Sequence, residues 1–233
     1  MDKSKRSKLP VLSQSDIWVV IPGYNEEKYL SRVLKKVKKY TPNIIFVDDG
    51  SQDATASIAE REIKHVLVHK VNLGKGSALK TGVEFAFNHL NAQAIIMMDA
   101  DDQHDSQDLS AFFEQLKKGE QVVLGIRKMD QQMPIVRRLG SQSLSFFVWL
   151  LFGVYVKDIL SGYKGFTKKI YQKLCWDSRA YGVESELAIR IAKYKLPFAI
   201  VPINTIYHDF DRGMTMLDSM EIIIHILTWR IFL

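Results

Sequence analysis

The chain has 233 residues, of which 47% are apolar and 25% charged, so it can form one sizeable globular domain and is not a disordered chain. Its single cysteine excludes an internal disulfide framework and favours a reducing compartment. The net charge of +6 suits an anionic membrane or phosphorylated small molecules. Nucleic acid is not expected as a partner, because the basic residues are spread out, with neither zinc-finger spacing nor an aromatic RNA-binding signature.

The first half of the chain alternates predicted strands and helices. Residues 1–15 precede them as a basic tail without the apolar core of a secretory signal. Short apolar runs rich in β-branched residues predict the strands, and apolar residues at helical spacing predict the helices. In chain order these elements are a strand at 16–22, a helix at 25–40, a strand within 43–51, a helix at 52–62 capped by Asp53, a strand at 65–70, a helix at 77–90, and strands at 94–99 and 122–127.

This alternation is typical of an α/β fold with a Rossmann-like, doubly wound and mostly parallel sheet flanked by helices. In such sheets, ligands bind beyond the carboxyl ends of the strands. Three of the predicted strands end in polar stretches, which read "PGYNEE", "DDGSQD" and "DADDQHD". We therefore expect these stretches to meet at one crevice.

The second half of the chain is less regular. Residues 139–156 carry no charge and only just reach the length of a bilayer span, and their serines and glycine favour a core or membrane-apposed helix instead. Residues 181–195 predict an amphipathic helix with Leu187, Ile191 and Tyr194 on its apolar face.

The last residues predict a membrane contact. Residues 219–233 are very apolar, but they are too short and too charged to span a bilayer securely. An interfacial helix with Trp229 and Arg230 at the level of the lipid headgroups is expected instead. The predicted organisation is the basic tail, one domain at 16–212 whose halves divide after residue 128, and an amphipathic membrane-associating helix at 213–233.

The stretch "IIMMDADDQHD" at 95–105 places four carboxylates at the end of a buried strand, although carboxylates repel one another and resist leaving water. A divalent cation explains this arrangement, because Asp99, Asp101 and the carbonyl of Gln103 are hard oxygen ligands of the kind that Mg²⁺ or Mn²⁺ prefers. Mg²⁺ usually completes its shell with substrate phosphates, so the predicted ligand is a metal-bound diphosphate. The alternative is a solvated acidic loop.

Four blocks, "VVIPGYNEE", "FVDDGSQDAT", "NLGKGSALKTG" and "MDADDQH", resemble the successive signatures of family 2 glycosyltransferases of the GT-A fold, in the same order and with matching spacing. The later block "DILSGYKGF" at 158–166 is similar to the Asp-x-x-Ser-Gly-Phe block of the branch that transfers sugars to polyprenyl phosphates, such as the dolichyl-phosphate mannose synthases. The resemblance covers residues 16 to 212.

The resemblance implies a donor site for a GDP- or UDP-sugar, with Asp101 and Gln103 as the direct ligands of the metal. Asp49 would face the edge of the base. A packing role for Tyr24 and turn roles for the glycines of "NLGKG" are structural alternatives that are compatible with donor binding. The residues implied in donor binding are Pro22, Tyr24, Asn25, Glu26, Val47, Asp49, Gly74, Lys75, Asp99, Ala100, Asp101 and Gln103.

The acceptor is implied by a second group of residues. A phosphate acceptor is already ionised near neutral pH and needs cations around it, whereas a sugar hydroxyl needs a general base. Glu184 and Glu186 lie where hydroxyl-using relatives carry that base, but the polyprenyl-phosphate branch also keeps an acid there. The residues that resemble phosphate contacts of that branch are Arg127, Arg137, Arg138, Ser161 and Arg212, and a solvated basic face is the alternative for the arginines.

The chain also departs from the branch at one place. Met216 stands where the dolichyl-phosphate mannose synthases usually carry a lysine, and His208 or Arg212 is expected to substitute for it as a phosphate contact. This difference weakens the assignment of GDP-mannose as the donor.

We therefore expect a metal-dependent, inverting enzyme at the cytoplasmic face of a membrane, which moves a sugar from a nucleotide sugar to a polyprenyl phosphate. Asp101, Arg127, Glu184 and Glu186 are its expected catalytic residues. Besides the donor, the acceptor lipid and the membrane surface, a membrane-protein partner or a second copy of the chain stays open. The alternatives are a saccharide-hydroxyl acceptor, as in polysaccharide or glycolipid assembly, and a nucleotide-binding module without activity.

Overall fold

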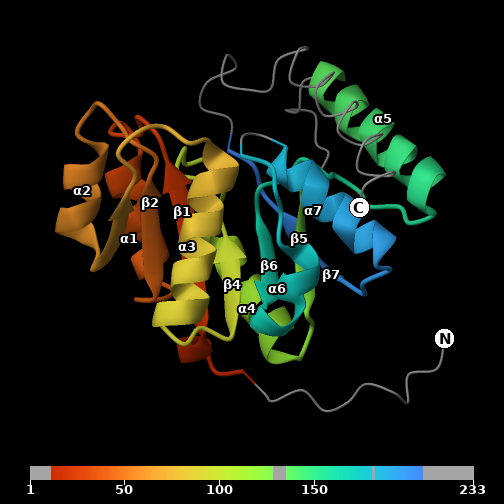
Figure 1. The fold of residues 1–233 in the computed structure, drawn as a ribbon, viewed down its shortest axis with the longest axis horizontal. Coiled ribbons are helices and arrows are strands. Elements are labelled where there is room, and N and C mark those ends of the chain that lie inside the picture. Colours follow the sequence, from red (N-terminus) through yellow and green to blue (C-terminus); the bar gives the residue numbers. More distant parts are fainter. Residues whose placement is uncertain (1–11, 128–134, 180–181, 207–233) are drawn as a thin grey trace.

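The computed structural model describes residues 12–127, 135–179 and 182–206 and shows one sheet with helices on both faces (Figure 1). In these residues, seven strands lie in the order β3-β2-β1-β4-β6-β5-β7, and every pair is parallel except those that β6 makes with β4 and β5. The strands are β1 (Ile17–Gly23), β2 (Ile44–Asp48), β3 (His65–Val68), β4 (Ala94–Met97), β5 (Val122–Arg127), β6 (Lys164–Thr167) and β7 (Ala199–Ile203). The helices are α1 (Leu30–Lys38), α2 (Thr55–Glu62), α3 (Lys75–His89), α4 (Leu109–Lys117), α5 (Ile135–Phe152), α6 (Lys168–Leu174) and α7 (Val183–Lys193). The predicted mostly parallel α/β sheet is confirmed.

Two apolar layers hold the helices to the two faces of the sheet. Because successive side chains of a strand point to opposite faces, β1 contributes to both layers. Ile17, Val19 and Ile21 join the layer that contains α1, α2 and α4, whereas Val20 joins the layer of α3, α5, α6 and α7. Each fully buried side chain of this kind contributes roughly 1.5–3 kcal/mol, so both layers are needed to fix the sheet edge where the polar stretches lie.

The five strands predicted from the first half of the chain are all present, and the helices differ only at their ends. α1 begins at Leu30 rather than at residue 25, because Asn25 takes a left-handed backbone conformation with φ of 55°. The N-cap of α2 is Ala54 rather than Asp53. The Asp53 carboxylate nevertheless accepts a hydrogen bond of 2.9 Å from the backbone N–H of Thr55.

Two strands at the far side of the sheet were not predicted. β6 has only four residues, two of which are Lys164 and Gly165, and it lacks the apolar run that marks the other strands. It pairs antiparallel with β4 and β5 and so lies between two strands that run the other way. β7 is the edge strand beyond β5, with alternate residues at least partly exposed.

The expectation of an amphipathic helix at 181–195 was wrong. α7 is buried on every side, and all residues from Val183 to Ala192 are buried, including the charged Glu184, Glu186 and Arg190. The reason is its position, because α5 and α6 pack against it on the sheet (Figure 1).

α5 begins four residues before the uncharged stretch 139–156, which the sequence predicts as a core or membrane-apposed helix, and it ends at Phe152. Of its described side chains, Leu144, Ser145 and Val148 are buried against the protein. The exposed large apolar side chains on this helix are Phe146, Phe147, Trp149 and Leu150. Within the described residues, no helix combines the length and the apolar character that a bilayer crossing requires. The predicted interfacial helix at 213–233 lies outside the described residues.

Candidate functional site at the carboxyl edge of the sheet

The three polar stretches meet as expected, because they follow strands that are neighbours in the sheet. β1 pairs in parallel with β2 on one side and with β4 on the other, so all three carboxyl ends lie at the same edge. At this edge the backbone N–H of Asp49 donates a 2.8 Å hydrogen bond to the carbonyl of Gly23. The three polar stretches therefore lie together at the carboxyl ends of adjacent parallel strands, which is where such sheets bind ligands.

The stretches after β1 and β2 are tied to each other by side-chain caps. The backbone N–H of Asn25 donates to Ser51 Oγ at 2.9 Å, and Asn25 Oδ1 accepts from the backbone N–H of Gln52 at 2.9 Å. The backbone N–H of Glu26 donates to Thr55 Oγ1 at 2.8 Å. These reciprocal bonds hold both predicted donor-binding stretches in one fixed arrangement.

The apolar residues predicted for the donor site differ in their exposure. Tyr24 is 41% exposed and is therefore available to a ligand. Pro22, Val47 and Ala100 are buried and form the packing beneath it. Only Tyr24 among these four has an exposed side chain at this edge of the sheet.

Asp49 organises the loop that leads into α3. Its carboxylate accepts hydrogen bonds from the backbone N–H groups of Leu73 at 3.0 Å and Gly74 at 2.8 Å. The Nδ1 atom of His69 lies 2.7 Å from Asp49 Oδ1, and its Nε2 atom lies 3.0 Å from Thr81 Oγ1. The carboxylate predicted to face the base is thus already bonded to the protein, and its contact with a base stays a prediction.

The centre of the site is an ion-pair cluster around Lys75, the first residue of α3. The Lys75 ammonium lies 2.7 Å from Asp99 Oδ1 and 2.7 Å from Glu184 Oε1. Burial opposes the charge of Lys75, but the two carboxylates raise its pKa well above the usual value. Burial likewise disfavours the charged form of Asp99, but Lys75 lowers the pKa of this carboxyl to about 2. Both groups therefore stay charged at neutral pH.

Asp101 is the carboxylate of this cluster that has no such counter-charge. Burial, and then the charge of Asp99, raise the pKa of Asp101. The backbone N–H of Gln103 donates to Asp101 Oδ1 at 3.0 Å, and within the described residues no Lys, Arg or His nitrogen lies within 4.0 Å of its carboxylate. Two repelling carboxylates with hard oxygen atoms suit a divalent cation, which would supply the missing positive charge.

The donor set is nevertheless incomplete as a protein-only metal site. No group of three or more His, Cys, Asp or Glu side chains is arranged to hold a metal within the described part of the chain. This is compatible with Mg²⁺, which usually takes one or two carboxylates and completes its shell with water and substrate phosphates. The residues present therefore fit a metal that arrives with a diphosphate.

The remaining polar residues of "DADDQHD" are bonded to the protein and hold this stretch in place. Asp102 is 1% exposed, has φ of 59°, and pairs with Lys36 of α1 at 2.6 Å. His104 Nδ1 accepts a 3.2 Å hydrogen bond from the backbone N–H of Asp99. Asp105 accepts a 3.0 Å hydrogen bond from the backbone N–H of Gln107 and so caps the short 3₁₀ helix η3 (Ser106–Asp108).

Arg127, at the end of β5, is held by Asp158 of the "DILSGYKGF" block. Its Nε atom donates to Asp158 Oδ2 at 2.9 Å, its Nη2 atom donates to Oδ1 at 2.5 Å, and its backbone N–H donates to Oδ2 at 2.9 Å. Burial raises the pKa of Asp158, but Arg127 more than offsets this and keeps the pKa below the usual value. The predicted phosphate contact of Arg127 would thus be made by a guanidinium whose orientation is fixed.

The same block contributes a buried lysine that the sequence reasoning missed. Lys164 is 3% exposed and donates to the carbonyls of Ile159, at 3.1 Å, and Ser161. Burial lowers the pKa of Lys164 to about 8, although Glu184 and Asp158 act to raise it. Its position in the recognisable block "DILSGYKGF" was the available signal.

The neighbouring residues of this block lie directly against the acidic cluster. A Cβ atom on Gly162 would be 2.6 Å from Asp99 Oδ2, so only glycine allows the segment to approach so closely. The Ser161 hydroxyl is buried and has no hydrogen-bond partner among the described residues. Its predicted contact with an acceptor phosphate would satisfy it.

The two predicted catalytic glutamates of α7 are not brought together. Glu184 meets Lys75, whereas Glu186 is fully buried and accepts hydrogen bonds from the backbone N–H groups of Asp177 and Ser178. Glu186 also pairs with Arg190 one turn later, at 2.7 Å. The site therefore contains Glu184, and Glu186 lies behind it.

Three predicted phosphate contacts have side chains outside the described part of the chain. Arg137 and Arg138 lie on α5, in the stretch where the structure describes the helix but not the side chains. Arg212 lies outside the described residues, as does His208. Their roles stay predictions.

The comparisons with known proteins agree with this arrangement. Residues 18–179 match the model of the family described as Glycosyl transferase family 2. The chain is 33% identical to the UDP-N-acetylglucosamine–dolichyl-phosphate N-acetylglucosaminyltransferase of Methanococcus voltae, with 91% of this chain and 94% of the relative covered. It is 25% identical to the polyprenol monophosphomannose synthase of Mycolicibacterium smegmatis, with 88% and 82% covered.

A solved structure shares the fold. The glucosyl-3-phosphoglycerate synthase from Mycobacterium tuberculosis, crystallised with Mn²⁺, UDP-glucose and phosphoglyceric acid, superimposes with a TM-score of 0.72. The identity is 21%, with 92% of this chain and 79% of the other covered, so this likeness speaks for the fold alone. The expected GT-A fold is confirmed.

Proposed function

The chain belongs to glycosyl transferase family 2, and from this premise we propose that it transfers one sugar, with inversion, from a nucleoside-diphosphate sugar to a polyprenyl phosphate. The observation that carries the choice of acceptor is the pairing of the acids around Lys75. Asp99 and Glu184 both lie 2.7 Å from its ammonium, so both carboxylates are already engaged in ion pairs. A sugar hydroxyl needs a general base, whereas a phosphate arrives ionised.

The donor would be held at the carboxyl edge of β1, β2 and β4. Tyr24 offers an exposed ring for the base, and Lys75 at the positive end of α3 suits the diphosphate. Asp101 and Asp99 would hold Mg²⁺ or Mn²⁺, with Gln103 beside them. The metal, when bound, neutralises the charge that develops on the departing nucleoside diphosphate.

The acceptor phosphate would lie on the other side of the cluster. Arg127 is oriented by Asp158, and the Ser161 hydroxyl lacks a partner among the described residues, so both suit a phosphate that arrives between them and the donor sugar. Arg137, Arg138 and Arg212 are proposed as further contacts. Attack by a phosphate oxygen on the face opposite the diphosphate gives the inverted linkage.

The proposed acceptor implies a peripheral position on a membrane. A polyprenyl phosphate is anchored in the bilayer by its tail, so the enzyme must work at the lipid surface. The exposed apolar face of α5 faces away from the core, and we propose that it contacts the bilayer together with residues 213–233. A soluble nucleotide-sugar donor would place this contact at the cytoplasmic face.

The deciding experiment compares sugar transfer to a polyprenyl phosphate with transfer to other acceptors. The purified chain is incubated with Mn²⁺, labelled UDP- or GDP-sugars, and vesicles that contain either a polyprenyl phosphate or the matching polyprenol without phosphate. We expect an acid-labile, lipid-linked sugar only with the phosphate. Transfer to a saccharide hydroxyl, with none to the lipid phosphate, would overturn the proposal and favour the polysaccharide or glycolipid alternative.

The donor nucleotide and sugar are the finer part of the proposal. The two named relatives differ in the sugar that their names give, and Met216 replaces the lysine usual in dolichyl-phosphate mannose synthases. We therefore propose a UDP-sugar rather than GDP-mannose. The same incubation with each donor tests this choice, because a product formed only from GDP-mannose contradicts it.

A further inference from the structure

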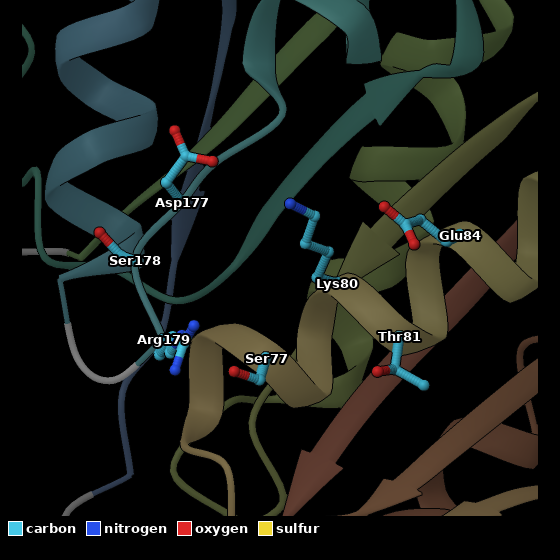
Figure 2. A pocket seen from close by; sticks show the side chains of 7 residues that line it. All are labelled: Ser77, Lys80, Thr81, Glu84, Asp177, Ser178 and Arg179. Atoms are coloured by element: carbon cyan, nitrogen blue, oxygen red, sulfur yellow. The ribbon is translucent and has the colours of Figure 1, made fainter. Parts of the chain in front are cut away.

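A short segment behind the site crosses the first turn of α3. Residues 176–179, here called the strap, connect α6 to the region before α7. Three of them line a recess together with residues of α3 (Figure 2), and its volume is about 440 Å³. The indole N–H of Trp176 donates to the carbonyl of Gly76 at 2.9 Å. The backbone N–H of Ser77 donates to the carbonyl of Arg179 at 3.1 Å. The strap is thus bonded to the two residues that follow Lys75.

At Gly76, the contact between the strap and α3 leaves no room for a side chain. A Cβ atom on Gly76 would lie 2.1 Å from the carbonyl oxygen of Ser178, which is far inside van der Waals contact. A shift of the strap therefore moves the beginning of α3. Because Lys75 is the preceding residue, its ammonium would move with that turn.

Glu186 holds the strap from the other side. Its carboxylate accepts from the backbone N–H of Asp177 at 3.0 Å, and from the backbone N–H and hydroxyl of Ser178 at 2.9 and 2.6 Å. Arg190 Nε donates to the same carboxylate at 2.8 Å, and Arg190 Nη2 reaches Asp177 Oδ2 at 3.1 Å. Each Glu186 oxygen is therefore used to fix the strap or the arginine.

Helix α7 links this network to the acidic cluster. Glu184 and Glu186 are two residues apart, so they lie on different sides of the helix. One side meets Lys75, and the other fixes the strap that packs on the turn after Lys75. One turn of α7 thus supplies Glu184, which pairs with the Lys75 ammonium, and Glu186, which fixes the strap against the first turn of α3.

We propose that Glu186 is a positioning residue, which places the Lys75 ammonium for the donor diphosphate through the strap. This inference rests on the proposed function, because it takes Lys75 as a donor contact. Removal of the Glu186 charge would also lower stability, because it breaks a buried ion pair with Arg190, so a readout of UDP affinity is needed to separate positioning from folding. Glu186 acts through geometry and touches neither donor nor acceptor.

The test is a double-mutant cycle between Glu186→Gln and Lys75→Met. The affinity for UDP with Mn²⁺ is measured by calorimetry for the native chain, both single variants and the double variant. We expect Glu186→Gln alone to weaken UDP binding roughly tenfold, as is typical for groups that orient a ligand contact. In the Lys75→Met background, where nothing is left to position, the same change should cost less than about twofold.

The matched control is Ser185→Ala, which lies between the two glutamates on α7. The Ser185 side chain is fully buried, and its hydroxyl has no hydrogen-bond partner among the described residues, so its removal should leave UDP affinity unchanged. An equal loss from Glu186→Gln in both Lys75 backgrounds would overturn the positioning role. Unchanged UDP affinity in Lys75→Met alone would instead contradict the role of Lys75 in the proposed function.

A milder variant keeps the test decisive if Glu186→Gln does not fold. Ser178→Ala removes only the hydroxyl that donates to Glu186 at 2.6 Å and leaves the backbone bonds of the strap. Because a hydrogen bond to a charged group is among the stronger ones, we expect Ser178→Ala to lower UDP affinity about threefold or more. In the Lys75→Met background the loss should again be smaller. No loss in a folded Ser178→Ala variant, as measured by the same titration, would count against the proposal.

Discussion

The sheet can be divided into two groups of strands, with β1, β2 and β4 on one side and β5, β6 and β7 on the other. The two groups carry their polar residues in different ways. On the side of β1, β2 and β4, Tyr24 and Asp99 stand after strand ends and are partly exposed, whereas Asp49 and Asp102 near them are buried. On the side of β5, β6 and β7, polar groups such as Asp158, Lys164 and Glu186 are buried and bonded to the protein. The first arrangement suits contact with a ligand, and the second suits the placement of the groups that make contact.

The largest effect is expected on the first side, from Asp101→Ala. Without this carboxylate, the charge of the leaving diphosphate is not neutralised by a correctly held metal, which should cost on the order of 10³-fold in kcat/KM. Transfer of labelled sugar measures the loss, and circular dichroism checks that the fold is intact. Unchanged activity would remove the argument for a metal at this edge.

The neighbouring acid provides a contrast to Asp101. Asp102 is buried against Lys36 and has no part in the proposed chemistry. Asp102→Asn should therefore lower the thermal midpoint, because it removes the buried carboxylate that pairs with Lys36 and Arg32, yet the folded protein should keep its activity. A loss of activity without loss of stability would show that the division between the two acids is wrong.

The next effect tests whether the second side positions the first. Asp158→Asn removes the bidentate partner of the Arg127 guanidinium, so the acceptor should bind in poorer geometry. We expect a loss of about 10- to 100-fold in kcat/KM for the polyprenyl phosphate, with the KM for the donor little changed. The matched control is Glu114→Gln, which breaks an exposed pair with Lys118 and should have no effect.

The difference between the two sides also explains what could be predicted from the sequence. β1, β2 and β4 are apolar runs followed by acids, so their parallel arrangement and the position of Asp99 follow from periodicity and from the rule for ligands in parallel sheets. β6 gives no such signal, because its four residues include a lysine and a glycine. Its antiparallel pairing depends on contacts with distant strands, which the local sequence does not encode.

The same reasoning explains the errors at α7. Glu184 and Glu186 look alike in the sequence, and only the direction of each side chain on the folded helix separates them. Lys164 was missed because a lysine in a short motif is expected at the surface, whereas here it is buried and its ammonium donates to the backbone carbonyls of Ile159 and Ser161. Buried charges depend on tertiary partners and are therefore the least predictable part of the site.

Lys164 makes the second side sensitive to pH. Burial lowers its pKa from 10.5 to about 8, with Lys75 acting in the same direction and Glu184, Asp158 and Asp99 acting against it. Between about pH 8 and 10.5 the unfolded chain holds a proton that the folded chain has released, so this residue makes the free energy of unfolding rise with pH. Below about pH 8 both states are protonated, and its contribution is constant.

The variant Lys164→Met should abolish that rise, which amounts to about 1.4 kcal/mol per pH unit at most. Denaturant titrations at several pH values between 7 and 10 measure it. Lys118→Met, which changes an exposed lysine at the end of α4, should keep the rise of the free energy of unfolding with pH. A rise that persists unchanged in Lys164→Met would mean that another group titrates in this range.

The smallest effect concerns α5, which covers the second side and shows apolar side chains to the outside. Trp149 is 46% exposed and lies beside Phe146, with 5.6 Å between ring centroids. If this face contacts lipid, Trp149→Ser should weaken binding to vesicles of anionic phospholipid by roughly tenfold, because less apolar surface enters the bilayer. Co-sedimentation with the vesicles measures the loss.

The control for Trp149 is an apolar residue of similar exposure at the other edge of the sheet. Val68 on β3 is 54% exposed, and Val68→Ser should leave vesicle binding unchanged. The comparison also separates membrane contact from chemistry, because Trp149→Ser should raise the KM for a vesicle-bound acceptor while UDP affinity stays the same. Equal losses from both variants would mean that α5 has no special role at the lipid surface.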